Sequence, residues 1–477
     1  MWLSCESGLD RSGIGDVAVS AGVRRIICEE EGKMSIQENL TTIEPVNGPL
    51  VGSISVPGDK SISHRAVLFA AMAEGTSRLS GVLDSEDVRS SLGAVSKLGA
   101  RWNLEKAPDG SLYGGITGWG AKGPSAPSEP IDCGNSGTTT RLLMGILAPW
   151  DIEVELTGDD SLRRRPMRRV SGPLSRMGAK FLPEGQDTLP LTIHGTRNLK
   201  ALDYDAPVAS AQVKTAILLA GLSADGTTRV TEPSPSRNHT ELMLPEFGAH
   251  TTAASGVAEV VDPTTLKASE VVVPGDPSSA AFIACAAALI PGSAIQIEGV
   301  SLNPARIGFL RTLEQMGVDA SRRSVSSSGK ELSGIISVQY CDKLHGCEVP
   351  ADKVPSLVDE VPVLALVAAH AKGITVFRGV DELRVKETDR VAAVIDGLTK
   401  IGVDAWADGS DLFIEGDPDL VIPEGVKFET GKDHRLAMTW ALAGLSGNCP
   451  VQVADFESCA VSYPAFLSDI RSLVRER

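Results

Sequence analysis

One pattern occurs six times along the sequence, and this repeat restricts the folds that the chain can adopt. Each copy has an apolar, alanine-rich run of helical length, then a Gly or Pro break, then alternating β-type residues. The ordinary alternation of an α/β protein does not explain breaks that are about 66 to 81 residues apart. We therefore expect six related helix–strand–helix–strand units, in an α/β or α+β fold. The breaks lie near Gly75, Pro149, Gly226, Gly292, Gly373 and Gly447.

A second mark appears in five of the six copies, where an amphipathic helix ends at a glycine. A small or branched residue follows each glycine and begins a strand. Glycine suits the left-handed conformation that ends many helices. The sixth copy reaches the last residue of the sequence without this glycine. The five positions are Gly99, Gly178, Gly248, Gly317 and Gly402.

Two nearly identical Pro-Gly-Asp passages divide the repeats into two groups of three. Val56–Ser61 precedes the first copy and Val273–Ser278 precedes the fourth. Pro and Gly predict sharp crossings, and the polar residue after them suits a helix N-cap. We therefore expect two similar domains, residues 58–274 and residues 43–57 plus 275–477, with one strand before the first crossing completing the second domain. Two crossings would permit hinge closure over a ligand.

The segment before these domains is residues 1–42, and its first 33 residues do not have the pattern of a targeting peptide. It lacks a continuous apolar stretch, and it is too acidic for a transit peptide. We expect a disordered tail, or a start codon assigned upstream of a real initiator at Met34. The sequence has no run of about 18 uncharged apolar residues and no CxxC pair among its eight cysteines. These features favour a cytoplasmic protein with reduced thiols and no contact with a membrane.

The net charge of −16 argues against binding to nucleic acid, because the chain has no excess of basic residues to displace counterions from phosphates. A negative total charge does not exclude small anionic ligands. A cleft can concentrate a local potential of the opposite sign.

Lys60, Ser61 and Arg65 lie at the expected start of the first helix. Ser61 and Arg65 are four residues apart and share one face. Free N–H groups and the positive end of the helix dipole suit a phosphate or carboxylate there. The alternative is a capped surface helix with solvated charges.

Two further motifs precede helices in the first half. Asp132–Arg141 is a small-residue loop that would let a ligand approach the backbone, although a tight strand–helix turn explains it equally well. It lacks the Gly-Lys-Ser/Thr ending of a Walker loop. Arg163–Arg169 contains five arginines, most of them expected on a solvated face. Arg165 is best placed to point inward, because Pro166 is expected to begin the next helix.

Ser210–Lys214 opens the helix of the third copy with neutral hydrogen-bonding groups. Arg237–Glu241 opens the next helix, where His239 is expected to be structural or capping. Asp359 and Glu360 precede the alanine-rich helix of the fifth copy. Burial at this helix end would raise the pKa of a carboxylate.

Lys386 and Arg390 share a face at helical spacing, with Glu387 beside them, and Asp433–Arg435 opens the sixth helix. Each motif alone could be a salt-bridged cap. All of them occur where a strand leads into a helix, so pseudo-symmetry would bring them to one face of each domain. A basic cluster in so acidic a protein predicts a strongly anionic ligand. Its members are Lys60, Arg65, Arg165, Lys386, Arg390 and Arg435.

In combination, these motifs resemble the 5-enolpyruvylshikimate-3-phosphate (EPSP) synthase family. The resemblance runs from about Ile43 to the C-terminus and includes PGDKSISHR, GNSGTTTR, RRPM, SAQVK, RVKETDR and DHR in order. SAQVK and RNHTE are similar to the class II, glyphosate-tolerant branch. The resemblance implies two domains, each an inside-out α/β barrel of three βαβαββ units.

The resemblance also implies an activity in the shikimate pathway of aromatic amino-acid biosynthesis. The enolpyruvyl group of phosphoenolpyruvate is transferred to the 5-hydroxyl of shikimate 3-phosphate, and phosphate is released. The reaction needs an acid–base pair but no metal and no organic cofactor. We expect a monomer that has these two small molecules as its partners.

Residue roles follow from the same resemblance. Asp359 would take the hydroxyl proton, and Glu387, with Lys60 nearby, would serve the methylene carbon. Shikimate 3-phosphate would be held by Lys60, Ser61, Arg65, Ser210, Ala211, Gln212, Arg237, Asp359 and Lys386. Phosphoenolpyruvate would be held by Lys60, Gly137, Arg165, Gln212, Arg390 and Arg435.

Two positions depart from patterns found in the family. Val461 stands where many members have a lysine. Gly137 is retained where some tolerant members have alanine, which implies more room for glyphosate and less tolerance. The rival enzyme is the UDP-N-acetylglucosamine enolpyruvyl transferase, which relies on a loop cysteine without a clear counterpart here. A non-catalytic sugar-phosphate-binding homologue should have lost Asp359 and Glu387.

Overall fold

A computed structural model describes residues 39–254, 256–261, 263–328 and 331–475. The expectations for residues 1–38, including the role of Met34, lie outside the described residues. Asn39–Arg477 form one compact unit. Its described strands make six sheets, one for each copy of the repeat, so the α/β repeat fold predicted from the sequence is confirmed.

The second copy shows how each unit is built. β6 (Ile131–Asp132) runs parallel to β7 (Glu153–Thr157), and α3 (Gly137–Leu147) connects them. After α5 (Arg168–Met177), β8 and β9 form a hairpin that pairs antiparallel with β7 through β9. The order is βαβαββ, as the family resemblance implies. The hairpin strands are β8 (Lys180–Leu182) and β9 (Leu191–His194).

The other two sheets of the first half have the same strand order, β14-β3-β5-β4 and β10-β11-β13-β12. Their strands are β3 (Thr76–Val82), β4 (Arg101–Lys106), β5 (Leu112–Thr117), β10 (Asp203–Asp205), β11 (Thr228–Thr231), β12 (Thr251–Ala254), β13 (Val257–Val260) and β14 (Glu270–Val272).

The second half has the sheets β2-β15-β17-β16, β18-β19-β21-β20 and β22-β23-β1. In the last of these sheets, β1 pairs antiparallel with β23. In the other copies, a strand of the hairpin occupies this position. The strands are β15 (Ala294–Ser301), β16 (Ala320–Ser328), β17 (Glu331–Gln339), β18 (Glu348–Val349), β19 (Gly373–Phe377), β20 (Asp404–Asp408), β21 (Asp411–Gly416), β22 (Lys427–Phe428) and β23 (Val451–Ala454).

The strands that precede the two crossings pair with strands that are far away in the sequence. β2 (Val51–Ser55) runs parallel to β15, whereas β14 runs parallel to β3. These pairings support our proposal that residues 58–274 form one domain and 43–57 plus 275–477 the other. The sequence predicts one strand before the first crossing, but the described residues 39–57 contain two. β1 (Leu40–Ile43) includes residues 40–42, which we had assigned to the tail.

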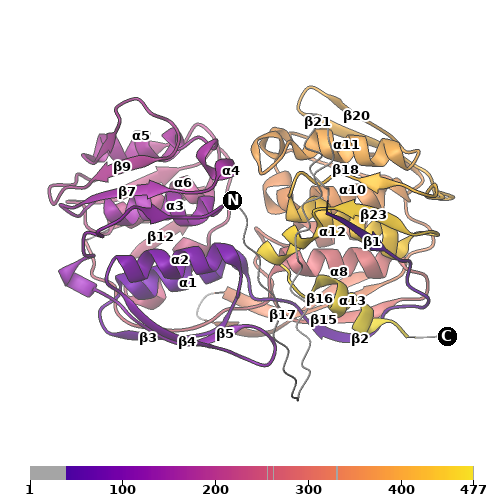
Figure 1. The fold of residues 1–477 in the computed structure, drawn as a ribbon, viewed down its shortest axis with the longest axis horizontal. Helices are drawn as coiled ribbons and strands as arrows, with labels where there is room; N and C mark the ends of the chain where they lie inside the picture. The colour runs from indigo at the N-terminus through magenta and orange to yellow at the C-terminus, as the bar shows by residue number, and fades with distance from the viewer. Residues whose placement is uncertain (1–38, 255, 262, 329–330, 476–477) are drawn as a thin grey trace, which may run out of the picture. The chain divides into compact units, whose positions relative to one another are not determined.

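The alanine-rich runs form central helices, and the sheets lie outside them. α8, α10 and α12 pack against one another, and each also packs on a sheet of its own half (Figure 1). In the first half α3 packs against both α1 and α6. The central helices are α1 (Lys60–Met72), α3, α6 (Ala211–Gly221), α8 (Pro277–Leu289), α10 (Val361–Ala369) and α12 (His434–Ser446).

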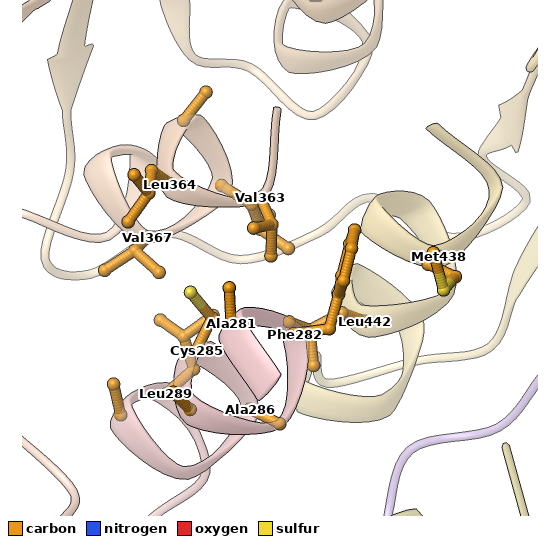
Figure 2. Close-up of a cluster of buried hydrophobic side chains, with 14 of the residues drawn as sticks. Ala281, Phe282, Cys285, Ala286, Leu289, Val363, Leu364, Val367, Met438 and Leu442 are labelled. Carbon is orange, nitrogen blue, oxygen red and sulfur yellow. The ribbon is translucent and has the colours of Figure 1, made fainter. Parts of the chain in front are cut away.

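Figure 2 shows why these runs lack a polar face. Side chains from different faces of α8, such as Phe282 and Cys285, are directed toward α12 and α10. Every residue of α8 is buried. A helix that is surrounded by protein is apolar on all sides, and small alanines allow close packing.

The outer helices bury only part of their residues, as expected for amphipathic helices on the surface of each half. The five glycines predicted to end them have φ values of +101°, +120°, +85°, +98° and +86°, so this prediction is confirmed. No helix in the described part of the chain is both long enough and apolar enough to cross a membrane. The remaining helices are α2 (Glu86–Lys97), α4 (Asp160–Arg163), α7 (His239–Met243), α9 (Gly308–Gln315), α11 (Arg390–Lys400) and α13 (Phe466–Leu473).

Gly145 sets the contact between α3 and α6. A Cβ atom at Gly145 would lie 2.1 Å from the carbonyl oxygen of Ala216, inside the van der Waals limit. We expect Gly145→Ala to lower the free energy of unfolding by about 1 to 3 kcal/mol, because the two helices would have to separate. Denaturant titration measures this change.

Gly93→Ala is the matched control, because Gly93 is an exposed glycine in α2 with no atom within 4 Å of an added Cβ. This variant should gain about 0.5 to 1 kcal/mol through helix propensity. Equal effects of the two substitutions would contradict close packing at Gly145.

Candidate active site

A hollow of about 330 Å³ is lined by residues from both halves, most of them at or near the starts of helices. Apart from Arg65, every residue that the sequence analysis assigned to catalysis or substrate binding lies in this lining. They are Lys60, Ser61, Gly137, Arg165, Ser210, Ala211, Gln212, Arg237, Asp359, Lys386, Glu387, Arg390 and Arg435.

The lining is strongly basic, in contrast to the whole chain. It contains nine lysines and arginines and five aspartates and glutamates, an excess of four positive charges. The chain as a whole carries −16. A concave surface with this excess concentrates a positive potential that attracts anions. The spatial convergence that the sequence analysis expected is therefore present.

Asp359 is surrounded by basic side chains of this lining. Its Oδ1 is 3.1 Å from Nη1 of Arg390 and 3.8 Å from Nζ of Lys386. Its Oδ2 is paired with Nη2 of Arg237 and lies 3.7 Å from Nη2 of Arg435. Arg237 comes from the first half and the other cations from the second. One carboxylate thus joins the basic groups of both halves.

The pKa of Asp359 contradicts our sequence-based expectation. Burial is the largest single influence and raises the pKa of this carboxyl, as expected at a buried helix end. The four surrounding cations, Arg435 first among them, outweigh burial and hold the pKa of Asp359 well below its usual range. The expected rise occurs at the neighbouring Glu360, where burial dominates and the pKa is raised.

Glu387 has a similar environment. Its Oε2 accepts a hydrogen bond of 2.7 Å from Arg390, and its Oε1 lies 3.6 Å from Nη1 of Arg165. Burial raises the pKa of Glu387, but Arg390, Arg165, His434 and a backbone hydrogen bond together outweigh burial and hold this pKa well below its usual range. Both candidate acid–base carboxyls are therefore ionised at neutral pH in this state.

Lys60 is the first residue of α1, immediately after the N-cap Asp59. Its Nζ lies 2.5 Å from Oδ2 of Asp87, and its backbone N–H donates to Oδ2 of Asp276 (3.1 Å). His434 is also buried beside the hollow. Burial, followed by the charge of Lys60, lowers the pKa of His434 to about 4, so its ring is neutral at neutral pH.

The small-residue loop begins α3 at Gly137 and meets α6 through side chains. Gln212 accepts a 2.6 Å hydrogen bond from Arg141 and donates one of 2.9 Å to Thr138. A Cβ atom at Gly137 would lie 3.4 Å from Nη1 of both Arg141 and Arg165. Gly137 therefore lies in van der Waals range of two guanidinium groups that line the hollow.

Two local predictions were wrong in their helix boundaries. α5 begins at Arg168 rather than at Pro166, although Arg165 still lines the hollow. Residues 386–390 do not form one continuous helix. A short 3₁₀ helix ends at Val385, and α11 begins at Arg390. Lys386 reaches Asp359 from the extended connection between them.

Arg65 lies behind the hollow rather than in its lining. Its guanidinium donates to the hydroxyls of Thr240 and Thr215 and to the carbonyl oxygen of Ser61. Contact between Arg65 and a substrate therefore remains a prediction. The prediction that His239 is structural agrees with its full burial and its 2.5 Å contact with Glu331.

Sequence reasoning missed several residues of the lining. Arg141 was visible in the sequence as the last residue of the small-residue motif, one turn after Gly137. Burial, then Arg165 and Arg169, lower the pKa of Arg141 to about 10, and it remains charged at neutral pH. The other missed charged or polar residues are Asp87, Thr138, Arg169, Ser236, Asp276, Arg306, Glu382 and His434.

Neither a metal-ligand cluster nor a thiol lies among the described residues of the hollow. Within residues 39–254, 256–261, 263–328 and 331–475, no three His, Cys, Asp or Glu residues are grouped as metal ligands. None of the six described cysteines lines the hollow, and neither does Val461. The described residues therefore offer no counterpart to the reactive loop cysteine of the rival transferase.

Similarity to known proteins covers most of the chain. A family model described as EPSP synthase (3-phosphoshikimate 1-carboxyvinyltransferase) matches residues 45–470. The 3-phosphoshikimate 1-carboxyvinyltransferase of Acidiphilium cryptum is 46% identical over 429 residues, which are 89% of this chain and 95% of that protein. The protein of the same name from Xanthomonas euvesicatoria is 45% identical over 417 residues, 87% and 93% of the two chains.

Solved structures agree with this similarity. An EPSP synthase from Acinetobacter baumannii superposes with a TM-score of 0.80 at 39% identity, covering 91% of this chain and 98% of the other. The enolpyruvyl transferase NikO from Streptomyces tendae has a TM-score of 0.73 at 19% identity, covering 91% and 97%, which shows a shared fold. The chain belongs to the EPSP synthase family.

Proposed function

We propose that this chain transfers the enolpyruvyl group of phosphoenolpyruvate to the 5-hydroxyl of shikimate 3-phosphate within the hollow described above. Phosphate is released, and the product leads toward the aromatic amino acids. Family membership supports the reaction. The observation that carries the site assignment is the excess of four positive charges around Asp359 in an acidic protein.

The charge of the substrates suits this lining. The two molecules carry two phosphates and two carboxylates, about five to six negative charges in total. Arginine forks can grip the oxygens of both groups in pairs. Shikimate 3-phosphate binds near Ser61, Ser210 and Arg237, and phosphoenolpyruvate near Gly137, Arg165 and Arg435. Lys386 belongs to the proposed site for shikimate 3-phosphate and Arg390 to that for phosphoenolpyruvate, and both contact Asp359.

Asp359 acts as the base that removes the proton of the 5-hydroxyl. In the ligand-free site its cationic neighbours make it a weak base. When the substrates bind, their phosphate and carboxylate groups form ion pairs with those cations. Asp359 then loses its own ion pairs with them. The pKa of Asp359 then rises toward that of a useful base. Substrate binding thus prepares the carboxylate for proton transfer.

The methylene carbon of phosphoenolpyruvate gains a proton as the hydroxyl oxygen attacks C2. Once the phosphate and carboxylate of phosphoenolpyruvate have engaged Arg165 and Arg390, the cations that contribute most to its low pKa, Glu387 takes up a proton from solvent and delivers it to the methylene carbon. Lys60 lies on the same lining and stabilises the negative charge of the transferred group. The C2 carbon is then tetrahedral.

The second step restores the double bond. The new methyl group returns a proton to Glu387, and the C–O bond to phosphate breaks. The proton taken from the 5-hydroxyl leaves with the phosphate. Asp359 ends ionised, and Glu387 ends with the proton that it held just before the first step and gives this proton back to solvent when the product leaves. Every step in this sequence is an acid–base or charge-stabilisation step that side chains of the lining can supply.

Phosphate release with alternative acceptors tests the reaction directly. We expect phosphate to appear only when phosphoenolpyruvate and shikimate 3-phosphate are both present. UDP-N-acetylglucosamine should not replace shikimate 3-phosphate, because the described lining has no thiol. Release with the UDP-sugar would favour the rival transferase, and binding of shikimate 3-phosphate without any release would favour a non-catalytic homologue.

Asp359→Asn separates binding from catalysis. We expect turnover to fall by about 10² to 10⁴-fold, because the base is lost. Shikimate 3-phosphate should bind at least as tightly as before, because Arg237 and Lys386 lose a competing carboxylate. Steady-state kinetics and calorimetric titration measure the two effects. The control is Asp396→Asn, which removes an exposed carboxylate of α11.

Retained turnover in Asp359→Asn would remove Asp359 from the role of base. Weakened binding of shikimate 3-phosphate would contradict the competition between the carboxylate and the substrate for the same cations.

Gly137→Ala tests the room available for the inhibitor glyphosate. The added methyl fits without a backbone clash but enters the hollow beside Arg141 and Arg165. A misplaced methyl costs a small ligand about 1 to 3 kcal/mol, so the inhibition constant of glyphosate should rise about 10- to 200-fold. The Michaelis constant for phosphoenolpyruvate should rise less.

Gly172→Ala in α5 is the control, because no atom lies within 4 Å of its added Cβ and it is outside the hollow. An unchanged or lower inhibition constant in Gly137→Ala would show that Gly137 does not limit the space for glyphosate.

A further inference from the structure

The two crossings are bonded to each other by their backbones in a symmetric way. The N–H of Asp59 donates to the carbonyl oxygen of Pro274 (2.7 Å), and the N–H of Asp276 donates to that of Pro57 (2.8 Å). Each aspartate is also the N-cap of a central helix, α1 and α8 respectively. The starts of these two helices are therefore adjacent at the point where the chain passes between its halves.

A single side chain, Arg306, joins both N-caps. It follows β15 in the chain, and its side chain is 2% exposed. Its Nη1 donates to Oδ2 of Asp59 (2.5 Å) and its Nη2 to Oδ1 of Asp276 (2.8 Å). Two nitrogens of one planar group thus fix the separation of two helix starts that belong to different halves of the chain.

The aspartates transmit this constraint to Lys60. Oδ2 of Asp276 accepts the backbone N–H of Lys60 (3.1 Å), and Oδ1 of Asp59 accepts that of Ile62 (2.7 Å). The first turn of α1, which carries Lys60 and Ser61 into the hollow, is therefore held by the same two carboxylates that Arg306 grips.

A second path leads from Arg306 to Arg435. Nη2 of Arg306 donates to Oγ of Ser278 (3.0 Å), and this hydroxyl donates to Oε1 of Glu360. The same oxygen of Glu360 lies 3.4 Å from Nη1 of Arg435. The chain of contacts therefore ends on a cation of the proposed phosphoenolpyruvate subsite.

A third path leads to the loop that carries Arg237. Nη1 of Arg306 lies 3.2 Å from Nε2 of His239. If this nitrogen accepts, the proton of the ring is on Nδ1 and donates to Glu331 (2.5 Å). His239 begins α7 two residues after Arg237.

We propose that Arg306 is a positioning residue for enolpyruvyl transfer. Its guanidinium holds α1 and α8 so that Lys60, from one half, meets Asp359 and Arg435, from the other. This inference rests on the proposed function. Eight other basic residues of the lining remain to bind the anions. Loss of the paired contacts of Arg306 with Asp59 and Asp276 therefore affects the alignment of the reacting groups more than the affinity for the substrates. Misplacement of reacting groups by about 1 Å can cost about 100-fold in rate.

Arg306→Lys tests this role while the positive charge is kept. An ammonium group cannot make the two parallel contacts of the planar guanidinium. We expect kcat to fall at least thirty-fold, while the Michaelis constants for both substrates change less than threefold. Kinetics are measured well below the unfolding temperature of the variant, with folding checked by circular dichroism.

Leu313→Ala is the stability control. Leu313 is buried in α9, in the segment that follows Arg306, and its substitution removes packing without touching the crossing. It should lower the unfolding temperature and leave kcat within twofold. Asp276→Asn is the second test variant, used also if Arg306→Lys does not fold. It weakens the contact between Arg306 and residue 276 and should lower kcat with little change in the Michaelis constants.

Three results would overturn the inference. These are an unchanged kcat in folded Arg306→Lys, a loss of kcat that Leu313→Ala reproduces at equal destabilisation, or a raised Michaelis constant at unchanged kcat. If Arg306→Lys does not fold, an unchanged kcat in Asp276→Asn would also overturn the inference. Wild-type enzyme that releases no phosphate from the two substrates would instead refute the proposed function, so the two failures are distinguishable.

Discussion

The site depends on one buried carboxylate, Asp359, and the four cations that surround it. These cations come from residues 237, 386, 390 and 435, so they meet only because the folded chain brings helix starts from both halves together. Four like charges at this distance would repel one another in the absence of a ligand. Asp359, with Glu387 nearby, reduces this repulsion until anionic substrates replace it.

This arrangement explains how an acidic protein can bind acidic substrates. The surface carries the negative charge, whereas the hollow carries an excess of positive charge. It also links binding to catalysis. The same arginines that keep the two carboxyls ionised are those proposed to grip phosphate and carboxylate. In the proposed mechanism, substrate binding releases the acid–base groups at the moment when they are needed, and the proposed role of Arg306 is to set the distance over which they act.

The architecture could be predicted from the sequence because it is repeated. Alanine-rich runs, Gly breaks and helix-ending glycines such as Gly178 are local signals, and six copies reinforce one another. Thirteen residues of the hollow were also predicted from the sequence, since they occur where strands lead into helices in the copies. Lys60, Gly137 and Ser210 are examples, and each begins or caps a central helix.

Features that depend on distant partners could not be predicted. The pKa of Asp359 moves opposite to the expected direction because four remote cations outweigh burial. The break between Lys386 and Arg390 follows from tertiary contacts that override helical spacing, and Arg65 turns toward threonines that are 150 and 175 residues away. Arg306 has no motif signal at all, since its role exists only where two crossings meet.

The most direct test of the account is a crystal structure of the complex with shikimate 3-phosphate and glyphosate. The account predicts both ligands inside the hollow, with the 5-hydroxyl within hydrogen-bonding distance of Asp359. The phosphate and carboxylate groups should have taken over contacts of Arg237, Arg390 and Arg435. Ligand density outside the hollow, or a 5-hydroxyl remote from Asp359 with its ion pairs intact, would contradict the account.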